Sequence, residues 1–257
     1  MQKNTVILVV VLLILSHSSF SQKSDSIKKV THFSGSVSVT NNGLSLVPTF
    51  SLGEPAALVN LSIGGKKFSF EPDMRFALEG KPWSFRFWAR YKLLKTEKFA
   101  ITLGSHPALN FKTFTSTVDG TETTVVRRFL AGELSPNYFI TKNISLGVYY
   151  VYAYGFDQGT PKNNHFVTLN SNFSNIKLPF NFLIGFTPQF YYLKQDQRDG
   201  YYFSSEFHLG RKNFPLSVSS IINKSIESNI IGSEDFVWNI SLIYSFNKKE
   251  YVEKQHP

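Results

Sequence analysis

The sequence contains no cysteine, which excludes disulfide bonds, thiolate metal sites and a thiol nucleophile. It is also poor in charge: acidic and basic residues make up only 18% of the chain, whereas 16% of its residues are aromatic. A chain this apolar is not expected to be disordered. Outside residues 6–15, no apolar run approaches the roughly 20 residues that a membrane-spanning helix needs, so a helical membrane protein with several spans is not expected either.

The first residues have the composition of an export signal. Lys3 supplies a positive charge, residues 6–15 (VILVVVLLIL) form an apolar stretch, and residues 19–21 (Ser-Phe-Ser) form a small-x-small cleavage site. We predict a cleavable signal peptide over residues 1–21; the alternative is an uncleaved anchor helix. Because no cysteine follows the apolar stretch, a bacterial lipoprotein anchor is excluded.

From residue 31 onward, alternating apolar and polar segments are separated by turn residues, which is typical of a transmembrane β-barrel. The clearest segment is Asp235–Phe246, where apolar residues occupy every second position from Phe236 to Phe246. A half-buried strand of a soluble protein looks similar, but so many aromatic strands are hard to bury in a chain of this length. We predict an all-β fold, a single antiparallel barrel of about twelve strands. The predicted strands cover residues 31–40, 46–63, 67–78, 83–94, 98–116, 122–139, 144–155, 165–174, 179–194, 200–210, 215–226 and 235–246.

Some proposed strands carry residues that strands disfavour. Residues 46–63 contain two prolines and a glycine and could instead form a short strand, a kink and another strand, so the strand count around residues 44–66 stays open. Pro107 and Pro136 also lie inside proposed strands, where each removes a hydrogen bond from the ladder. We expect a β-bulge at each of these two prolines.

The predicted connections fall into two alternating sets. Short basic turns occupy residues 64–66, 95–97, 140–143, 175–178 and 211–214; the other set is generally longer and includes residues 156–164, 195–199 and 227–234. In bacterial barrels the short turns face the periplasm. An even strand number then places both termini in the periplasm. We predict a periplasmic N-terminal segment over residues 22–30, the barrel over residues 31–246 and a periplasmic tail over residues 247–257. The basic turns could contact anionic lipid head groups.

Two segments carry a resemblance to a known class. The segment NISLIYSF, which ends at Phe246, is similar to the aromatic last strand of bacterial outer-membrane barrels, although eleven further residues (NKKEYVEKQHP) follow it here. The resemblance implies an outer-membrane location, contact with outer-membrane lipids, and recognition of this strand by the barrel-insertion machinery. A mature start at Gln22 resembles exported proteins of the Bacteroidota, a Gram-negative group.

Alternation assigns an inner face to the two most highly charged strands. A charge facing lipid costs about 2–4 kcal/mol at the membrane midplane, so the charged face is predicted to point into the lumen. Reading Gly80-Lys81 as a two-residue turn pairs Glu71 with Arg90, Asp73 with Trp88, and Arg75 with Arg86. The predicted lumen or constriction residues are Glu71, Asp73, Arg75, Arg86, Trp88, Arg90, Lys92, His106, Lys112, Arg127, Glu133, Glu206 and His208.

The charged inner wall allows two interpretations. It could line a narrow passive channel for small polar or anionic solutes, which is our leading prediction. It could instead fill a non-conducting barrel that is structural or belongs to a secretion or assembly complex. No external loop looks long enough for a large plug, so any constriction is expected from wall side chains or from residues 22–30.

Enzymatic and cofactor functions find little support in the sequence. An outer-membrane lipid hydrolase is the third hypothesis, and the nearest constellation for it is His165 with Ser171 and Ser174. Glu206 and His208 share one face, but no third metal ligand is evident. No nucleotide-binding or zinc-binding pattern occurs. We therefore predict no catalytic residue, metal or cofactor, and the dispersed basic residues do not favour nucleic-acid binding.

Overall fold

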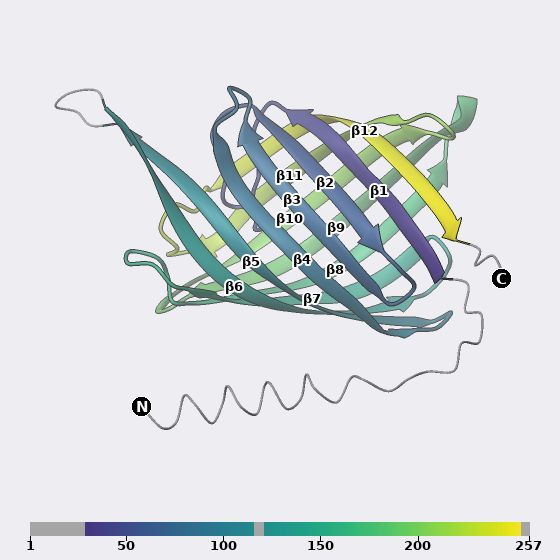
Figure 1. Cartoon of the computed structure of the whole chain (residues 1–257), viewed down its shortest axis with the longest axis horizontal. Coiled ribbons are helices and arrows are strands. Elements are labelled where there is room, and N and C mark those ends of the chain that lie inside the picture. The colour runs from purple at the N-terminus through teal and green to yellow at the C-terminus, as the bar shows by residue number, and fades with distance from the viewer. Residues whose placement is uncertain (1–28, 116–120, 253–257) are drawn as a thin grey trace, which may run out of the picture. The chain divides into compact units, whose positions relative to one another are not determined.

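The computed structural model describes residues 29–115 and 121–252 and contains a closed antiparallel barrel of twelve strands (Figure 1). The fold class predicted from the sequence is thereby confirmed. The strands are β1 (Lys29–Thr40), β2 (Ala56–Gly64), β3 (Phe68–Ala77), β4 (Pro82–Lys95), β5 (Phe99–Thr115), β6 (Glu122–Phe139), β7 (Ile144–Gly155), β8 (Asn163–Lys177), β9 (Phe182–Gln195), β10 (Arg198–Arg211), β11 (Leu216–Ser228) and β12 (Phe236–Val252). The predictions for residues 1–28, the signal peptide among them, lie outside the described residues.

Each strand pairs with its neighbours in sequence, and β1 closes the barrel against β12. At this seam the amide of Asn41 donates to the carbonyl of Ile240 at 3.2 Å, and the rings of Phe33 and Phe246 lie 5.4 Å apart. β12 continues to Val252, past the predicted end at Phe246. In the described part of the chain, no helix is long and apolar enough to cross a membrane.

The connections alternate between the two ends of the barrel. One end, here called the turn end, carries residues 65–67, 96–98, 140–143, 178–181 and 212–215. The other, the loop end, carries residues 41–55, 78–81, 156–162, 196–197 and 229–235. The even strand number puts the start of β1 and the end of β12 together at the turn end.

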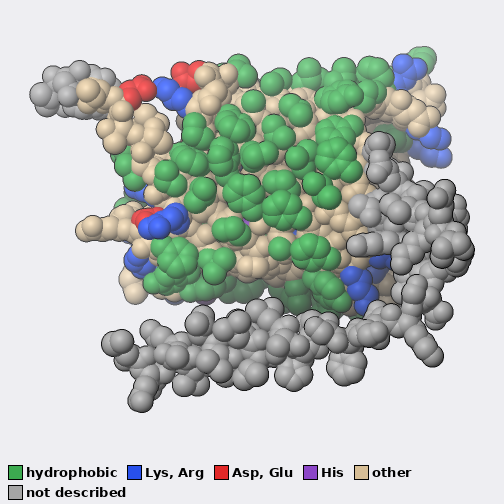
Figure 2. Space-filling view, viewed as in Figure 1, with side chains coloured by type: hydrophobic (Ala, Val, Ile, Leu, Met, Phe, Trp, Pro, Cys, Tyr) green, Lys and Arg blue, Asp and Glu red, His purple; other side chains and the backbone are tan. Residues whose placement is uncertain are grey.

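The outer wall of the barrel is apolar. Large apolar side chains are exposed along every strand, for example Leu169 with 61% and Phe190 with 58% of its surface exposed. On the face drawn in Figure 2, hydrophobic side chains cover much of the wall, and charged groups lie toward the ends of the barrel. Such a coat is stable only in contact with lipid, and it matches the outer band of membrane barrels.

The bulges expected at Pro107 and Pro136 are absent, so that prediction was wrong. Both prolines keep a continuous register with one neighbouring strand: Pro107 pairs with Leu130, and Pro136 pairs with Ile101. The pairing of β5 with β4 is interrupted at Pro107, and that of β6 with β7 at Pro136, without any change in register. An antiparallel residue directs its N–H toward only one neighbour, so each proline costs one local bond rather than a bulge.

Residues 46–63 do not form the predicted strand. β2 begins only at Ala56, and residues 41–55, here called L1, form a loop with a single bridge between Leu44 and Ser51. Pro48 lies at the tip of this small hairpin, where the amide of Phe50 donates to the carbonyl of Val47 at 3.1 Å. The two prolines and the glycine that interrupted the pattern therefore belong to the loop.

The register of β3 with β4 also differs from the prediction. Asp73 pairs with Arg86, and Glu71 pairs with Trp88, rather than Asp73 with Trp88 and Glu71 with Arg90. The turn is longer than two residues: β3 ends at Ala77, β4 begins at Pro82, and the amide of Ala77 donates to the carbonyl of Lys81 at 2.9 Å. Gly80, with φ at +94°, occupies a backbone conformation suited to glycine in this turn.

The lipid-facing wall generates a stability prediction. Leu169→Arg, in the middle of β8, is expected to lower the free energy of unfolding by about 2–4 kcal/mol, because the charge faces lipid. Asn172→Arg is the matched control, since Asn172 lines an internal cavity on the same strand. Urea titration of both variants in lipid vesicles measures the difference. Equal destabilisation would contradict the assignment of faces.

Candidate functional site

The inner wall carries two ion-pair triads. In the first, Asp73 on β3 binds two arginines: Arg75 Nε lies 3.0 Å from one carboxylate oxygen, and Arg86 Nη2 lies 2.5 Å from the other. The register places Asp73 directly opposite Arg86 on β4. Arg75 instead faces Ser84, so the arginines do not oppose each other across the strands. With all three groups ionised, this triad carries one surplus positive charge.

The second triad has the opposite composition. Arg90 on β4 binds Glu71 through Nη1 and Glu133 through Nε, the latter at 2.5 Å. The Tyr149 hydroxyl donates to Glu133 at 2.7 Å. Gly104 makes room for the buried carboxylate, since a Cβ there would lie 2.5 Å from Glu133 Oε1. With its groups ionised, this triad carries one surplus negative charge.

Trp88 lies between the two triads. The Arg90 guanidinium lies 4.3 Å from the centre of the Trp88 ring, which is a cation–π distance. The His106 ring centre is 3.6 Å from that of Trp88. Arg86 and His106 are both buried, and Arg86 Nε and His106 Nδ1 have no hydrogen-bond partner among the described residues.

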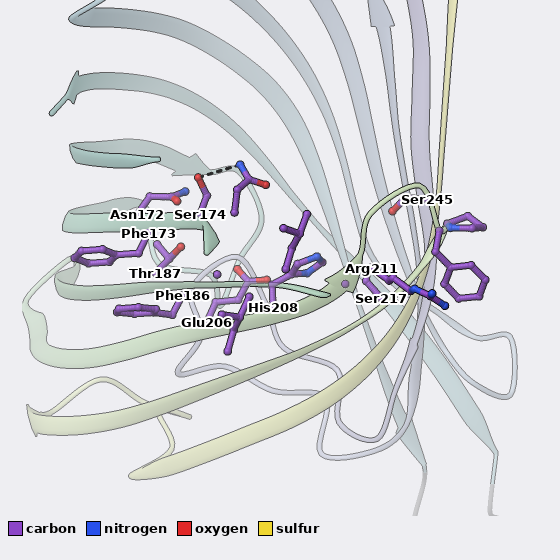
Figure 3. A pocket seen from close by; sticks show the side chains of 17 residues that line it. Asn172, Phe173, Ser174, Phe186, Thr187, Glu206, His208, Arg211, Ser217 and Ser245 are labelled. Carbon is purple, nitrogen blue, oxygen red and sulfur yellow. Dashed lines mark hydrogen bonds between the residues drawn. The ribbon is translucent and has the colours of Figure 1, made fainter. Parts of the chain in front are cut away.

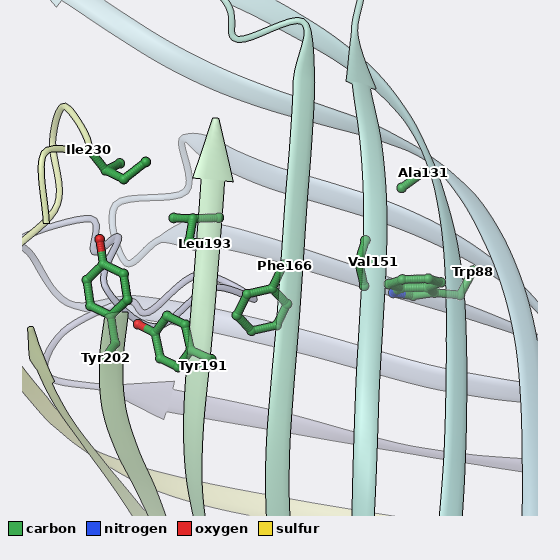
Figure 4. Close-up of a cluster of buried hydrophobic side chains, with 8 residues drawn as sticks. All are labelled: Trp88, Ala131, Val151, Phe166, Tyr191, Leu193, Tyr202 and Ile230. Atoms are coloured by element: carbon green, nitrogen blue, oxygen red, sulfur yellow. The ribbon is translucent and has the colours of Figure 1, made fainter. Parts of the chain in front are cut away.

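An aromatic row continues around the inner wall from Trp88 (Figure 4). Phe166 on β8 contacts Tyr191 on β9 edge to face at 5.2 Å, and Tyr191 stacks on Tyr202 of β10 at 4.7 Å. The Tyr191 hydroxyl donates to Asn223 Oδ1 at 2.7 Å, which satisfies its polar end inside the barrel. With Ala131, Val151, Leu193 and Ile230, these rings form an apolar cluster inside the lumen.

L1 folds into the lumen and packs against this cluster. Its apolar residues Leu46, Val47 and Phe50 contact the cluster. Arg75 donates to the carbonyl of Leu44, which ties L1 to the first triad.

L1 is also tied to the loop between β11 and β12. The Thr49 hydroxyl bonds Ser233 at 2.8 Å, the amide of Glu234 donates to the Thr49 carbonyl at 3.1 Å, and the Ser51 hydroxyl donates to the Glu234 carboxylate. L1 thus bridges the lumen. The sequence predicts no loop that crosses the lumen. This prediction is wrong, because part of L1 was assigned to a strand.

Two cavities border L1. A loop-end cavity of about 650 Å³ and a neck of about 150 Å³ share Phe50, Ser84 and Asn110 in their linings and therefore adjoin each other. A turn-end cavity of about 440 Å³ is lined by different residues (Figure 3).

The remaining predicted lumen residues lie away from the triads. Lys112 and Arg127 line the loop-end cavity, and Glu206 and His208 line the turn-end cavity. Lys92 follows Arg90 on β4 toward the turn end. The structure therefore brings together Glu71, Asp73, Arg75, Arg86, Trp88, Arg90, His106 and Glu133 and separates them from Lys92, Lys112, Arg127, Glu206 and His208.

Lys81 stands at the rim of the loop-end cavity, in the turn between β3 and β4. Its ammonium group lies 3.0 Å from Glu122 and 3.1 Å from Glu79. Hydrogen bonds to these two carboxylates raise the pKa of Lys81 above its ordinary value. The charge of Lys81 at the rim is thus neutralised by Glu79 and Glu122. The surplus charges lie deeper in the barrel, in the two triads.

His165 offers no hydrolase site. Its Nδ1 lies 2.9 Å from the Tyr150 hydroxyl, and Ser174 bonds the carbonyl of Asn143 instead of a histidine. In the described part of the chain, no group of three or more His, Asp or Glu side chains is placed to hold a metal ion. Glu206 and His208 line one cavity as a pair.

Tyr149 and L1 are among the contributors to the lumen that were not predicted from the sequence. Tyr149 shares the inward parity of Gly147 and Ala153 on β7, so alternation could have identified it. L1 could have been recognised by its prolines and glycine, but nothing in its sequence states that it turns inward.

No protein-family model and no curated protein matches the chain. Solved structures do match. An outer membrane channel from Pseudomonas putida F1 aligns with a TM-score of 0.52 and 9% identity, over 87% of this chain and 97% of that one. The NanC porin gives 0.49 and 13%, over 83% and 99%, and the KdgM porin with disordered oligogalacturonate gives 0.48 and 12%, over 84% and 99%. The chain has the fold of an outer-membrane β-barrel. At these identities the likeness extends to the fold alone.

The triads of this outer-membrane barrel generate a second stability prediction. Asp73→Asn leaves Arg75 and Arg86 without their shared counter-charge, and it is expected to cost about 3–5 kcal/mol, as for other broken buried ion pairs. The matched control is Asp235→Asn, since Asp235 is 91% exposed and lies 3.6 Å from Lys224. Urea unfolding in vesicles should show a large loss for the first variant only. An unchanged Asp73→Asn barrel would contradict the triad.

Proposed function

We propose that the chain is a narrow passive channel of the outer membrane for small polar or anionic solutes, with L1 as its constriction. The observation that carries this proposal is the pair of polar cavities, one at each end of the closed barrel. A barrel with only a structural role does not need cavities of about 440 and 650 Å³ with polar side chains in their linings. A solute that crosses would pass the first triad and the aromatic row.

The proposed orientation follows from the two kinds of connection. The loop end faces the cell exterior, and the turn end, with both ends of the barrel wall, faces the periplasm. The export signal predicted over residues 1–21 and insertion through the last strand belong to the same proposal. The fold of outer-membrane barrels and the apolar outer coat support this location.

One observation favours a second function. The neck and the turn-end cavity share no lining residue, and L1 packs against the apolar cluster inside the lumen. A barrel whose lumen L1 closes would pass no solute. It would instead be a structural element or a subunit of a larger outer-membrane complex.

Ion current across planar bilayers distinguishes the two functions. The native barrel is expected to show a small current. A variant with Leu46, Val47 and Phe50 replaced by serine loses the apolar contacts of L1 with the cluster, so a severalfold larger current is expected, since a wider water-filled lumen conducts more.

The matched control is Ile231→Ser, which alters an exposed side chain of another loop at the same end. Its current should equal that of the native barrel. If native and L1 variants are both folded, as heat-dependent gel migration shows, and neither passes current, the channel is refuted and the second function stands.

A further inference from the structure

The neck cavity is lined by a combination of side chains that neither the stability of the fold nor a water-filled path requires. Its wall combines apolar side chains, such as Phe50, Val151 and Phe166, with the two buried polar groups Arg86 and His106. Arg86 exposes 4% of its surface and His106 exposes 3%. A buried polar atom without a partner costs free energy, so the two unpartnered nitrogens, Arg86 Nε and His106 Nδ1, mark a place for a further group.

Several other polar side chains of the neck bond to the protein. Ser84 donates to Asn110 Oδ1 at 3.0 Å, and Gln195 donates to Asn164 Oδ1 at 2.9 Å. Asn164 itself donates to the carbonyl of Ala153 at 3.1 Å. Among the neck residues, Arg86 and His106 carry the buried side-chain nitrogens that have no hydrogen-bond partner in the described part of the chain.

The charge of the neck favours an anion. Arg86 belongs to the triad in which Asp73 serves two arginines, so one positive charge has no acidic partner within the triad. The acids of the second triad bind Arg90, and none of its three members lines the neck. A buried surplus charge is costly unless it is paired, and a carboxylate would pair it through charge-assisted hydrogen bonds.

The size of the neck limits the rest of the ligand. A cavity of about 150 Å³ lined by apolar side chains accepts a body the size of benzene. A longer chain would have to extend into the adjoining loop-end cavity. Phe50 and Val47 of L1 form one side of the cavity, so the ligand would contact the constriction itself.

We propose that the neck is a binding site for a small monocarboxylate with a compact apolar or aromatic body. The carboxylate accepts hydrogen bonds from Arg86 and His106, and the body packs among Phe50, Val151 and Phe166. This proposal adds the class of solute to the proposed channel function, and as a statement about transport it rests on that function. Binding itself does not depend on transport and can be measured separately.

Calorimetry on the full-length folded barrel in detergent micelles tests the site, with benzoate as the probe and benzyl alcohol as its neutral counterpart. Heats from empty micelles are subtracted. Saturable benzoate binding is expected, with benzyl alcohol at least about tenfold weaker, which is the loss that one charge-assisted hydrogen bond accounts for. Absence of saturable benzoate binding, or equal affinity for the alcohol, would overturn the proposal.

Variants locate the binding. Arg86→Met removes the surplus charge and leaves Asp73 paired with Arg75, and His106→Phe keeps an aromatic ring on Trp88 while removing Nδ1. Each is expected to weaken benzoate binding about tenfold or more. If the Arg86→Met variant does not fold, the benzoate affinity of the His106→Phe variant alone tests the site.

The matched control is Arg127→Met, because Arg127 lines the loop-end cavity but not the neck. Its affinity for benzoate should be native. If it loses as much affinity as the neck variants, the attraction is a general effect of lumen charge and the site is refuted.

Bilayer current in potassium chloride is recorded in parallel. Current without benzoate binding refutes the site alone, and binding without current refutes the channel alone.

Discussion

The structure depends on where a membrane barrel can put its charges. The outer wall faces lipid, so charged side chains of the central strands have only the lumen available, and there they must pair with one another. Asp73 is the key residue of this arrangement because it binds Arg75 and Arg86 at once. Arg90 repeats the pattern with the signs reversed, between Glu71 and Glu133. Each triad keeps one surplus charge, and together the two are neutral.

The two triads have different consequences because they have different neighbours. In the negative triad, Glu133 accepts a hydrogen bond from the Tyr149 hydroxyl and Arg90 lies on Trp88, so its charged groups bind other groups of the wall. The positive triad borders the neck through Arg86 and binds the L1 backbone through Arg75. One wall therefore supplies both the attachment of L1 and an unpaired charge beside it.

Much of this barrel could be predicted from alternation, because lipid outside and polar lumen inside impose a strict period of two on every strand. That period yields the strand number and the inward parity of Asp73 and Arg86. It does not yield register, which depends on turn geometry: reading Gly80-Lys81 as the whole turn shifted the expected partner of Asp73 from Arg86 to Trp88. It also says nothing about L1, whose inward path depends on contacts with Ser233 and Glu234, far away in sequence.

L1 is the element whose movement would disturb the fold least. The wall is held by continuous backbone ladders, so opening it would break many hydrogen bonds together. L1 is held by a few polar contacts, worth about 0.5–1.5 kcal/mol each, and by Leu46, Val47 and Phe50, each worth at most about 1.5–3 kcal/mol. Local opening at this cost leaves the barrel intact, since weakly held segments open independently of the core. A ligand in the neck would touch both Arg86 and Phe50, so its binding and the position of L1 would be coupled.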